Sequence, residues 1–170
     1  MRNARYILCA ALAALTAATP ANGATPAQQS NGRALILVPL TLTKINDLSF
    51  GSVVPSAVSG VVTINATTGA RTFAGGVTGV PSDAGNRAYF AGAGSPSQLV
   101  IVTMNPPAQL LDGTGDTIDV LALTLDGPAI RTIDPVARTF YVGVGGTILI
   151  AASQAEGLYT NTFDVTANYQ

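Results

Sequence analysis

The sequence has no histidine and no tryptophan, and its 170 residues include only one cysteine. Without histidine the chain cannot form a serine–histidine–acid triad or a histidine-ligated zinc site. Cys9 lies in an apolar stretch near the N-terminus, which leaves the rest of the chain without thiol chemistry. Two carboxylates could still hydrolyse a glycosidic bond, but Glu156 is the single glutamate and most aspartates lie in turn-like sequences. We therefore expect a non-catalytic protein without a cofactor.

Charged residues are scarce, at 10% of the chain, whereas hydrophobic residues make up 48%. Beyond residue 24 there are six basic and nine acidic side chains, and the basic ones form no cluster. Lys44, the single lysine, is most simply a solvated charge at a strand edge. Because nucleic-acid binding requires a positively charged surface, nucleic acid is not expected as a partner.

The N-terminus has the order typical of a secretory signal peptide, which we predict over residues 1–24. A basic start is followed by an apolar stretch and then by small residues: Met1, Arg2 and Arg5; residues 6–18; Ala21, Gly23 and Ala24. The apolar stretch is shorter than the roughly 20 residues of a membrane-spanning helix, and no later stretch approaches that length. We expect an exported protein of the periplasm, cell surface or extracellular space, with no transmembrane segment in the mature chain.

The remaining residues, about 146, are enough for one domain. Residues 25–33 are polar and are predicted to be a leader, followed by a single domain over residues 34–170. In that domain, short apolar segments alternate with turn residues, and no helical period appears. We therefore predict an all-β fold, an immunoglobulin-like antiparallel β-sandwich of about seven to nine strands. The candidate strands are residues 60–65, 71–74, 87–91, 98–104, 117–125, 137–144, 147–152 and 159–169. Residues 99–102 and 120–123 are apolar on both faces, so we expect them to be covered on both sides.

The C-terminus shows the cleanest strand pattern. Phe163, Val165, Ala167 and Tyr169 alternate with polar residues, so they share one face of an extended chain. We expect this strand to close the fold with these four side chains inward. The Tyr169 hydroxyl is expected to reach water or a carbonyl.

A second apolar run, Leu35, Ile36, Leu37 and Val38, lies between the polar leader and Pro39. One interpretation is an assembly strand that is donated to a neighbouring subunit, where it pairs with an exposed sheet edge beside the C-terminal strand. The other interpretation is the first strand of the chain's own sandwich, with Ile36, Val38, Leu40 and Leu42 inward. The sequence leaves both open.

Two loops resemble ligand sites only in part. Asp112, Asp116 and Asp119 offer carboxylate oxygens of the kind that bind calcium, but aspartate and glycine are also ordinary turn residues. The glycine-rich residues 143–147 lack the lysine and the helix of a phosphate-binding loop, so we predict a β-bulge or a tight hairpin there.

Four motifs resemble a family of secreted bacterial domains of unknown function: Leu48-Ser49-Phe50-Gly51, Val144-Gly145-Gly146-Thr147-Ile148, Gly157-Leu158-Tyr159 and Phe163-Asp164-Val165-Thr166-Ala167-Asn168-Tyr169. That family is similar to spore coat protein U-like domains and to pilin subunits of the archaic chaperone-usher class. The resemblance covers residues 34–170 and implies an immunoglobulin-like sandwich without catalytic residues.

The expected function is therefore that of a structural subunit of a surface appendage or coat. Its expected partners are other copies of the chain or other pilin-like subunits, with a periplasmic chaperone as a further candidate. The alternative is a monomeric surface or periplasmic module that binds a glycan or a protein. Against sugar stacking, most aromatic residues occupy core-like strand positions: Phe73, Tyr89, Phe90, Phe140, Tyr141 and Tyr159.

Overall fold

A computed structural model describes residues 27–170 of the chain. The predicted signal peptide, Cys9 and the first two residues of the predicted leader lie outside the described residues. Residues 27–40 belong to no strand, and the compact domain spans Ile36–Gln170. No helix in the described part of the chain is long and apolar enough to cross a membrane.

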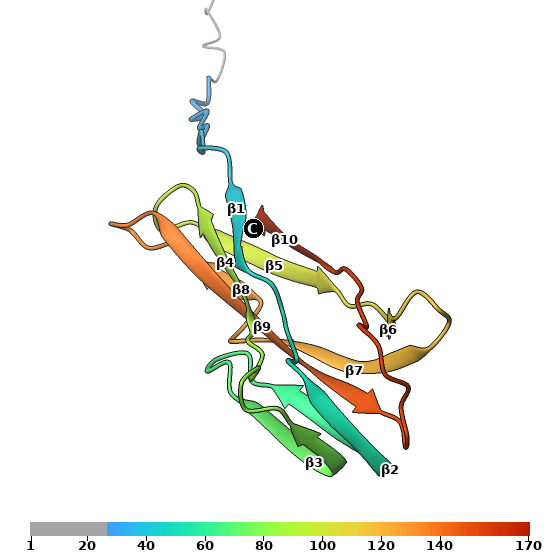
Figure 1. Cartoon of the computed structure of the whole chain (residues 1–170). Coiled ribbons are helices and arrows are strands. Elements are labelled where there is room, and N and C mark those ends of the chain that lie inside the picture. Colours follow the sequence, from blue (N-terminus) through green and yellow to red (C-terminus); the bar gives the residue numbers. More distant parts are fainter. Residues whose placement is uncertain (1–26) are drawn as a thin grey trace, which may run out of the picture. The chain divides into compact units, whose positions relative to one another are not determined.

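The described residues form ten strands in two antiparallel sheets (Figure 1), which confirms the predicted all-β sandwich. The strands are β1 (Thr41–Asn46), β2 (Val53–Ile64), β3 (Arg71–Gly79), β4 (Ala88–Ala93), β5 (Leu99–Asn105), β6 (Gln109–Leu111), β7 (Thr117–Leu125), β8 (Ile130–Thr132), β9 (Thr139–Ile150) and β10 (Asp164–Tyr169). The number exceeds the predicted seven to nine because β6 and β8 have only three residues each, too few to show an alternating pattern.

The long strand β9 organises the larger sheet. Its residues 139–144 pair with β4, which in turn pairs with β1, and its residues 146–150 pair with β2, which pairs with β3. Strand β7 pairs with residues 144–149 of β9, and β6 extends β7. The smaller sheet has the order β10-β5-β8. Strands β1 and β10 are therefore edge strands of the larger and the smaller sheet.

Two hydrophobic clusters make up the core. The first lies between β4 and β9 of the larger sheet and β5 and β10 of the smaller one, and it includes Val100, Ile133 and Val142, each 0% exposed. The second lies at the far half of the larger sheet, around β2, β7 and β9. None of its members comes from the smaller sheet, so loops cover this half of the larger sheet.

The glycine pair Gly145-Gly146 lies inside β9, which replaces the two predicted strands 137–144 and 147–152. The predicted bulge or tight hairpin at residues 143–147 is therefore wrong. The irregularity lies on the neighbouring strand β7, whose register shifts between Val120 and Ala122. Glycine is required at position 145 because a Cβ there would lie 2.5 Å from the backbone nitrogen of Ala66.

The expected burial of residues 99–102 and 120–123 on both faces is also wrong. Val100 and Val102 are buried, whereas Leu99, Ile101 and Leu121 are exposed. A sandwich has two layers, so each strand keeps an outer face, and an apolar sequence alone does not supply a third layer to cover it.

The C-terminal strand has the predicted orientation. Phe163, Val165, Ala167 and Tyr169 are half-buried against the first core cluster, and the residues between them are exposed. The strand begins at Asp164 rather than at residue 159. The Tyr169 hydroxyl donates to the Val38 carbonyl oxygen at 2.8 Å, which confirms that it reaches a carbonyl.

Candidate functional site

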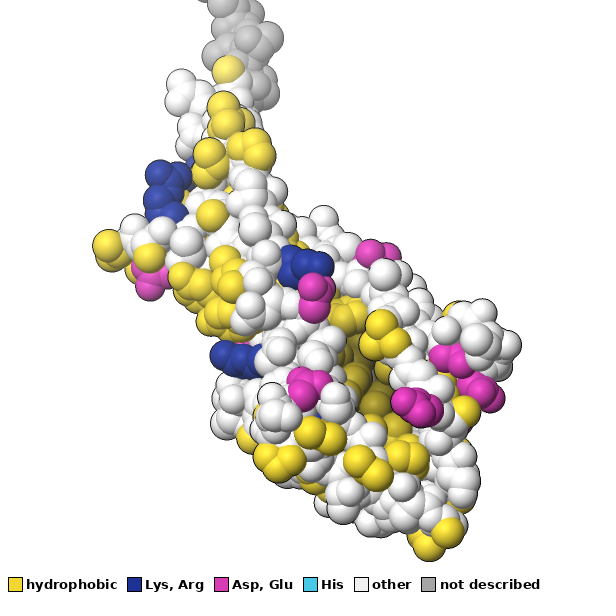
Figure 2. Space-filling view, in the orientation of Figure 1, with side chains coloured by type: hydrophobic (Ala, Val, Ile, Leu, Met, Phe, Trp, Pro, Cys, Tyr) yellow, Lys and Arg dark blue, Asp and Glu magenta, His cyan; other side chains and the backbone are white. Residues whose placement is uncertain are grey.

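A groove of about 700 Å³ opens over the second core cluster, where no strand of the smaller sheet covers the larger one. Its walls are two connections: residues 48–52 between β1 and β2, and residues 154–163 between β9 and β10. Figure 2 shows a recess floored by hydrophobic side chains, with acidic side chains near its margin. The apolar lining includes Phe50, Val53, Leu110, Ile118, Val120, Ile148 and Ile150.

An arginine holds the first wall in place. Nη1 of Arg71, from β3, donates to the carbonyl oxygens of Phe50 and Ser52 at 2.9 and 3.1 Å, and Nη2 donates to that of Val80 at 3.0 Å. Gly51 lies between the first two carbonyls with a φ of +68°, a conformation that favours glycine. One side chain thus fixes the loop whose Phe50 ring lines the groove.

The second wall is held through a few polar contacts. Thr160 exchanges two backbone hydrogen bonds with Leu111 of β6, at 3.0 and 2.8 Å. Gln154 Nε2 donates to the Tyr159 hydroxyl at 3.0 Å, and that hydroxyl donates to the Ala155 carbonyl at 2.9 Å. Within the described residues, the backbone from 155 to 163 makes backbone–backbone hydrogen bonds only through Thr160. Side chains already occupy the Ala155 carbonyl and the Thr162 amide, which donates to Asn161 Oδ1, and the amide and carbonyl groups that remain can pair with an added strand.

The groove contains few charged groups. Asp83 and Glu156 are the only charged residues of its lining. The Ser52 hydroxyl donates to Asp83 Oδ2 at 2.7 Å, and this hydrogen bond is the main cause that lowers the pKa of Asp83 below its ordinary value of 3.8. An apolar floor with an acidic margin is a surface on which an apolar segment can be buried.

The predicted assembly residues divide into a free part and a tethered part. Leu35 and Ile36 are in no strand and are 74% and 93% exposed, and Leu37 is half-buried. Val38 is held by its own domain, because its amide donates to Ser95 Oγ at 2.9 Å and its carbonyl accepts from Tyr169. The sandwich's own first strand is β1, so the interpretation of residues 36–42 as that strand is wrong for residues 36–40.

The three aspartates proposed for calcium do not converge. Asp112 Oδ1 accepts hydrogen bonds from the amides of Thr114, Gly115 and Asp116, at 2.8 to 3.0 Å, which makes it the organiser of a tight turn. Asp119 accepts from Gln109 on the facing strand. In residues 27–170, no group of three or more acidic, histidine or cysteine side chains could hold a metal ion.

The aromatic residues differ from the expectation that most of them belong to the core. Phe90 and Phe140 are buried, but Phe73 is 40% exposed. Tyr89 and Tyr141 stack at 5.7 Å between ring centroids on the outer face of the larger sheet, and Tyr141 is 50% exposed. The guanidinium of Arg87 lies over the Tyr89 ring at 4.6 Å.

Residues 40–169 match a family described as a domain of unknown function (DUF4402), and the chain therefore belongs to that family. No curated protein and no solved structure matches the chain. The motifs Leu48-Ser49-Phe50-Gly51 and Gly157-Leu158-Tyr159 form parts of the two groove walls. Sequence reasoning singled out both motifs but missed that they face each other across a groove, and it also missed Arg71, since a lone arginine in a strand gives no local signal.

Proposed function

We propose that this protein is a non-catalytic structural subunit that assembles by β-strand addition. The residues around Leu35 and Ile36 of one copy occupy the groove of another, and the assembly forms a surface appendage or coat. The observation that carries this proposal is a complementarity within one chain. The domain has an open apolar groove, and the same chain carries exposed apolar residues that belong to none of its own strands.

The energetics require backbone pairing as well as burial. Full burial of Leu35 and of Ile36 contributes about 1.5 to 3 kcal/mol for each side chain. The two contributions together reach only the lower part of the range of free energy that two molecules lose in translational and rotational freedom when they associate. Hydrogen bonds to those backbone groups of residues 155–163 that neither Leu111 nor a side chain occupies, each worth about 1 kcal/mol, supply the remainder. The groove therefore suits an extended segment better than a compact apolar ligand.

The predicted export supports the same proposal. The signal-peptide pattern of residues 1–24 predicts export from the cytoplasm, and appendages and coats are built outside it. The resemblance to archaic chaperone-usher pilins and to spore coat protein U-like domains adds the expectation of pilin-like partners and a periplasmic chaperone.

The test is a double substitution in the full-length protein, Leu35→Asp with Ile36→Asp, examined by sedimentation velocity and electron microscopy. Two charges cannot enter an apolar groove, so the variant should remain a folded monomer while the wild type forms polymers. Val136→Asp is the matched control, because Val136 is 89% exposed in the turn between β8 and β9. A wild type that stays monomeric at high concentration, or a double variant that polymerises normally, would refute the proposal.

The outer face of the larger sheet favours a second candidate function. The Arg87–Tyr89–Tyr141 stack presents a half-exposed aromatic ring on a strand, as modules that bind sugars or planar groups do. Glycan-array binding that is lost in Tyr141→Ala but kept in the Leu35→Asp, Ile36→Asp variant would favour this monomeric binding module.

A further inference from the structure

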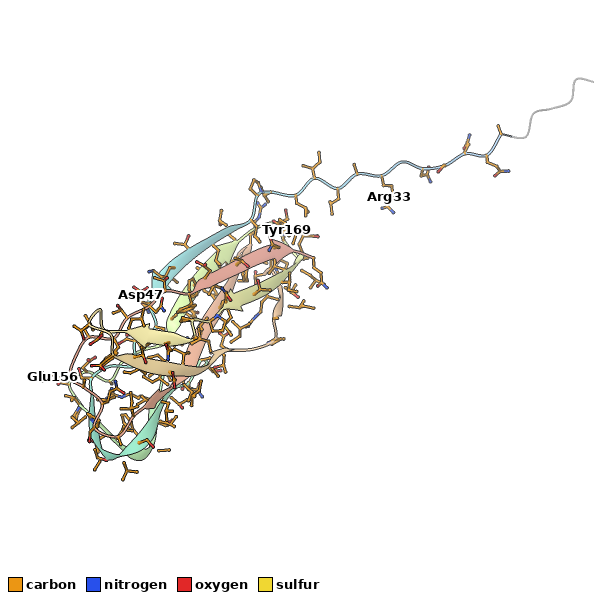
Figure 3. All side chains as sticks on the ribbon, turned by 90° about the vertical axis from the view of Figure 1, so that its right-hand side faces the viewer. Arg33, Asp47, Glu156 and Tyr169 are labelled. Atoms are coloured by element: carbon orange, nitrogen blue, oxygen red, sulfur yellow. The ribbon has the colours of Figure 1, made fainter. Side chains whose placement is uncertain are left out.

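The tether of Val38 lies at the opposite end of the domain from the entrance of the groove. Both backbone groups of Val38 are engaged, the amide by Ser95 Oγ and the carbonyl by the Tyr169 hydroxyl. The Tyr169 hydroxyl also accepts the backbone amide of Ser95 at 2.7 Å, so the three residues form one closed network. Figure 3 shows Tyr169 at one end of the domain and Glu156, which lines the groove, at the other.

Chain lengths show what this tether prevents. Phe163 is the lining residue of the groove that directly precedes β10, and six residues of extended strand, about 20 Å, separate it from Tyr169. From a fixed Val38, the three residues back to Leu35 span at most about 11 Å. If Val38 were released, the first fixed residue would be Leu40, which is half-buried against the first core cluster, and the five residues back to Leu35 would span about 17 Å. The tether thus shortens the reach of the apolar residues by about a third and keeps them short of their own groove.

We propose that Tyr169 and Ser95 are specificity-determining residues, which prevent the segment around Leu35 and Ile36 from filling its own groove and so commit it to a second copy. The inference rests on the proposed function. The packing around the network supports a dedicated contact, because a Cβ at the neighbouring Gly94 would lie 2.5 Å from the Tyr169 hydroxyl. Only glycine lets this hydroxyl approach the loop between β4 and β5.

The experiment compares full-length Tyr169→Phe and Ser95→Ala with the wild type and with Tyr141→Phe. Tyr169→Phe keeps the ring and removes the hydroxyl, whereas Ser95→Ala removes only the acceptor of the Val38 amide. Tyr141→Phe is the matched control, because the Tyr141 hydroxyl has no hydrogen bond within the described residues and lies on the outer face. Sedimentation velocity over a wide concentration range measures the monomer fraction, and hydrogen exchange followed by mass spectrometry measures protection of residues 34–37 in that monomer.

In both tether variants, the monomer fraction at the highest concentration should rise about tenfold, the factor that one hydrogen bond of typical strength represents. This monomer should persist to higher concentrations than the wild-type monomer, because filling of the chain's own groove is unimolecular and competes with assembly, and its residues 34–37 should be protected from exchange. The wild type and Tyr141→Phe should give a monomer that declines with concentration and leaves these residues unprotected.

Three results would overturn the inference. The first is assembly of the folded tether variants as in the wild type, which leaves the proposed function standing. The second is a persistent monomer whose residues 34–37 exchange freely, which reduces the tether to a purely structural role. The third is a wild type that never assembles, which removes the proposed function together with the inference. Ser95→Ala carries the test alone if Tyr169→Phe does not fold.

Discussion

Replacement of Arg71 by methionine should weaken one wall of the groove by a predictable amount. The variant keeps an apolar stem of similar length but loses the three hydrogen bonds to the carbonyls of Phe50, Ser52 and Val80. A hydrogen bond from a charged donor contributes about 1.5 to 3 kcal/mol, and water at this partly exposed site replaces some of that loss. We therefore expect a total loss of about 2 to 4 kcal/mol, which lowers the Tm by about 5 to 15 °C for a domain of this size.

Arg87→Met is the matched control for this prediction. Arg87 donates to the carbonyls of Ala66 and Thr67 and lies over the Tyr89 ring, but it does not line the groove. Both variants should lose comparable stability in thermal unfolding followed by circular dichroism. At a temperature where both are folded, only Arg71→Met should assemble more weakly in sedimentation velocity. Equal assembly of the two variants, or an unchanged Tm for Arg71→Met, would refute the assigned role of Arg71.

Three further predictions concern the domain itself. Ile133→Ala should cost about 2 to 5 kcal/mol in urea unfolding because Ile133 is fully buried, whereas Val136→Ala at an exposed turn should change stability by less than about 0.5 kcal/mol. Gly145→Ala should destabilise the domain by about 1 to 3 kcal/mol, because the added Cβ meets rigid backbone. Gly157→Ala should be tolerated, because the nearest atom to its added Cβ would lie at 3.4 Å. Equal urea midpoints for the two variants would contradict this account. Hydrogen bonds from the backbone amides of Ala137 and Val136 lower the pKa of Asp134 below its ordinary value of 3.8. The contribution of Asp134 to stability is therefore complete above that value and disappears as the pH falls through the lower folded-state pKa. Asp134→Asn should reduce the loss of stability measured between about pH 5, which lies above both pKa values, and acid conditions.

The sequence predicts best where one strand carries its own pattern. The alternation from Phe163 to Tyr169 identified the buried face of β10, because successive side chains of any strand point to opposite faces. The bounds of β7 agree with the predicted residues 117–125 for the same reason: turn residues flank an extended apolar run. In both cases the information lies within ten consecutive residues.

The features that make up the groove depend on contacts that no local pattern records. Val38 meets Ser95 and Tyr169 across 57 and 131 residues of sequence, and Arg71 reaches back about 20 residues to the loop at Phe50. The exposed face of β5 shows the same limit, since apolar Ile101 looks buried until the number of layers is known. A short apolar pattern states that a residue prefers burial, and the rest of the chain decides whether a neighbour covers it.

If the chain assembles as proposed, the open groove couples the stability of each domain to its assembly. Phe50, Val120 and Tyr159 pack only partly against the second core cluster, so apolar surface that a complete sandwich would bury remains beside the groove. Any segment that binds the folded domain and not the unfolded chain adds its binding free energy to the free energy of unfolding. If the tether at Val38 acts as we propose, the chain's own apolar residues do not reach the groove, and that added stability comes from a second molecule. Under this proposal, folding stability is a property of the assembly and increases with the concentration of subunits.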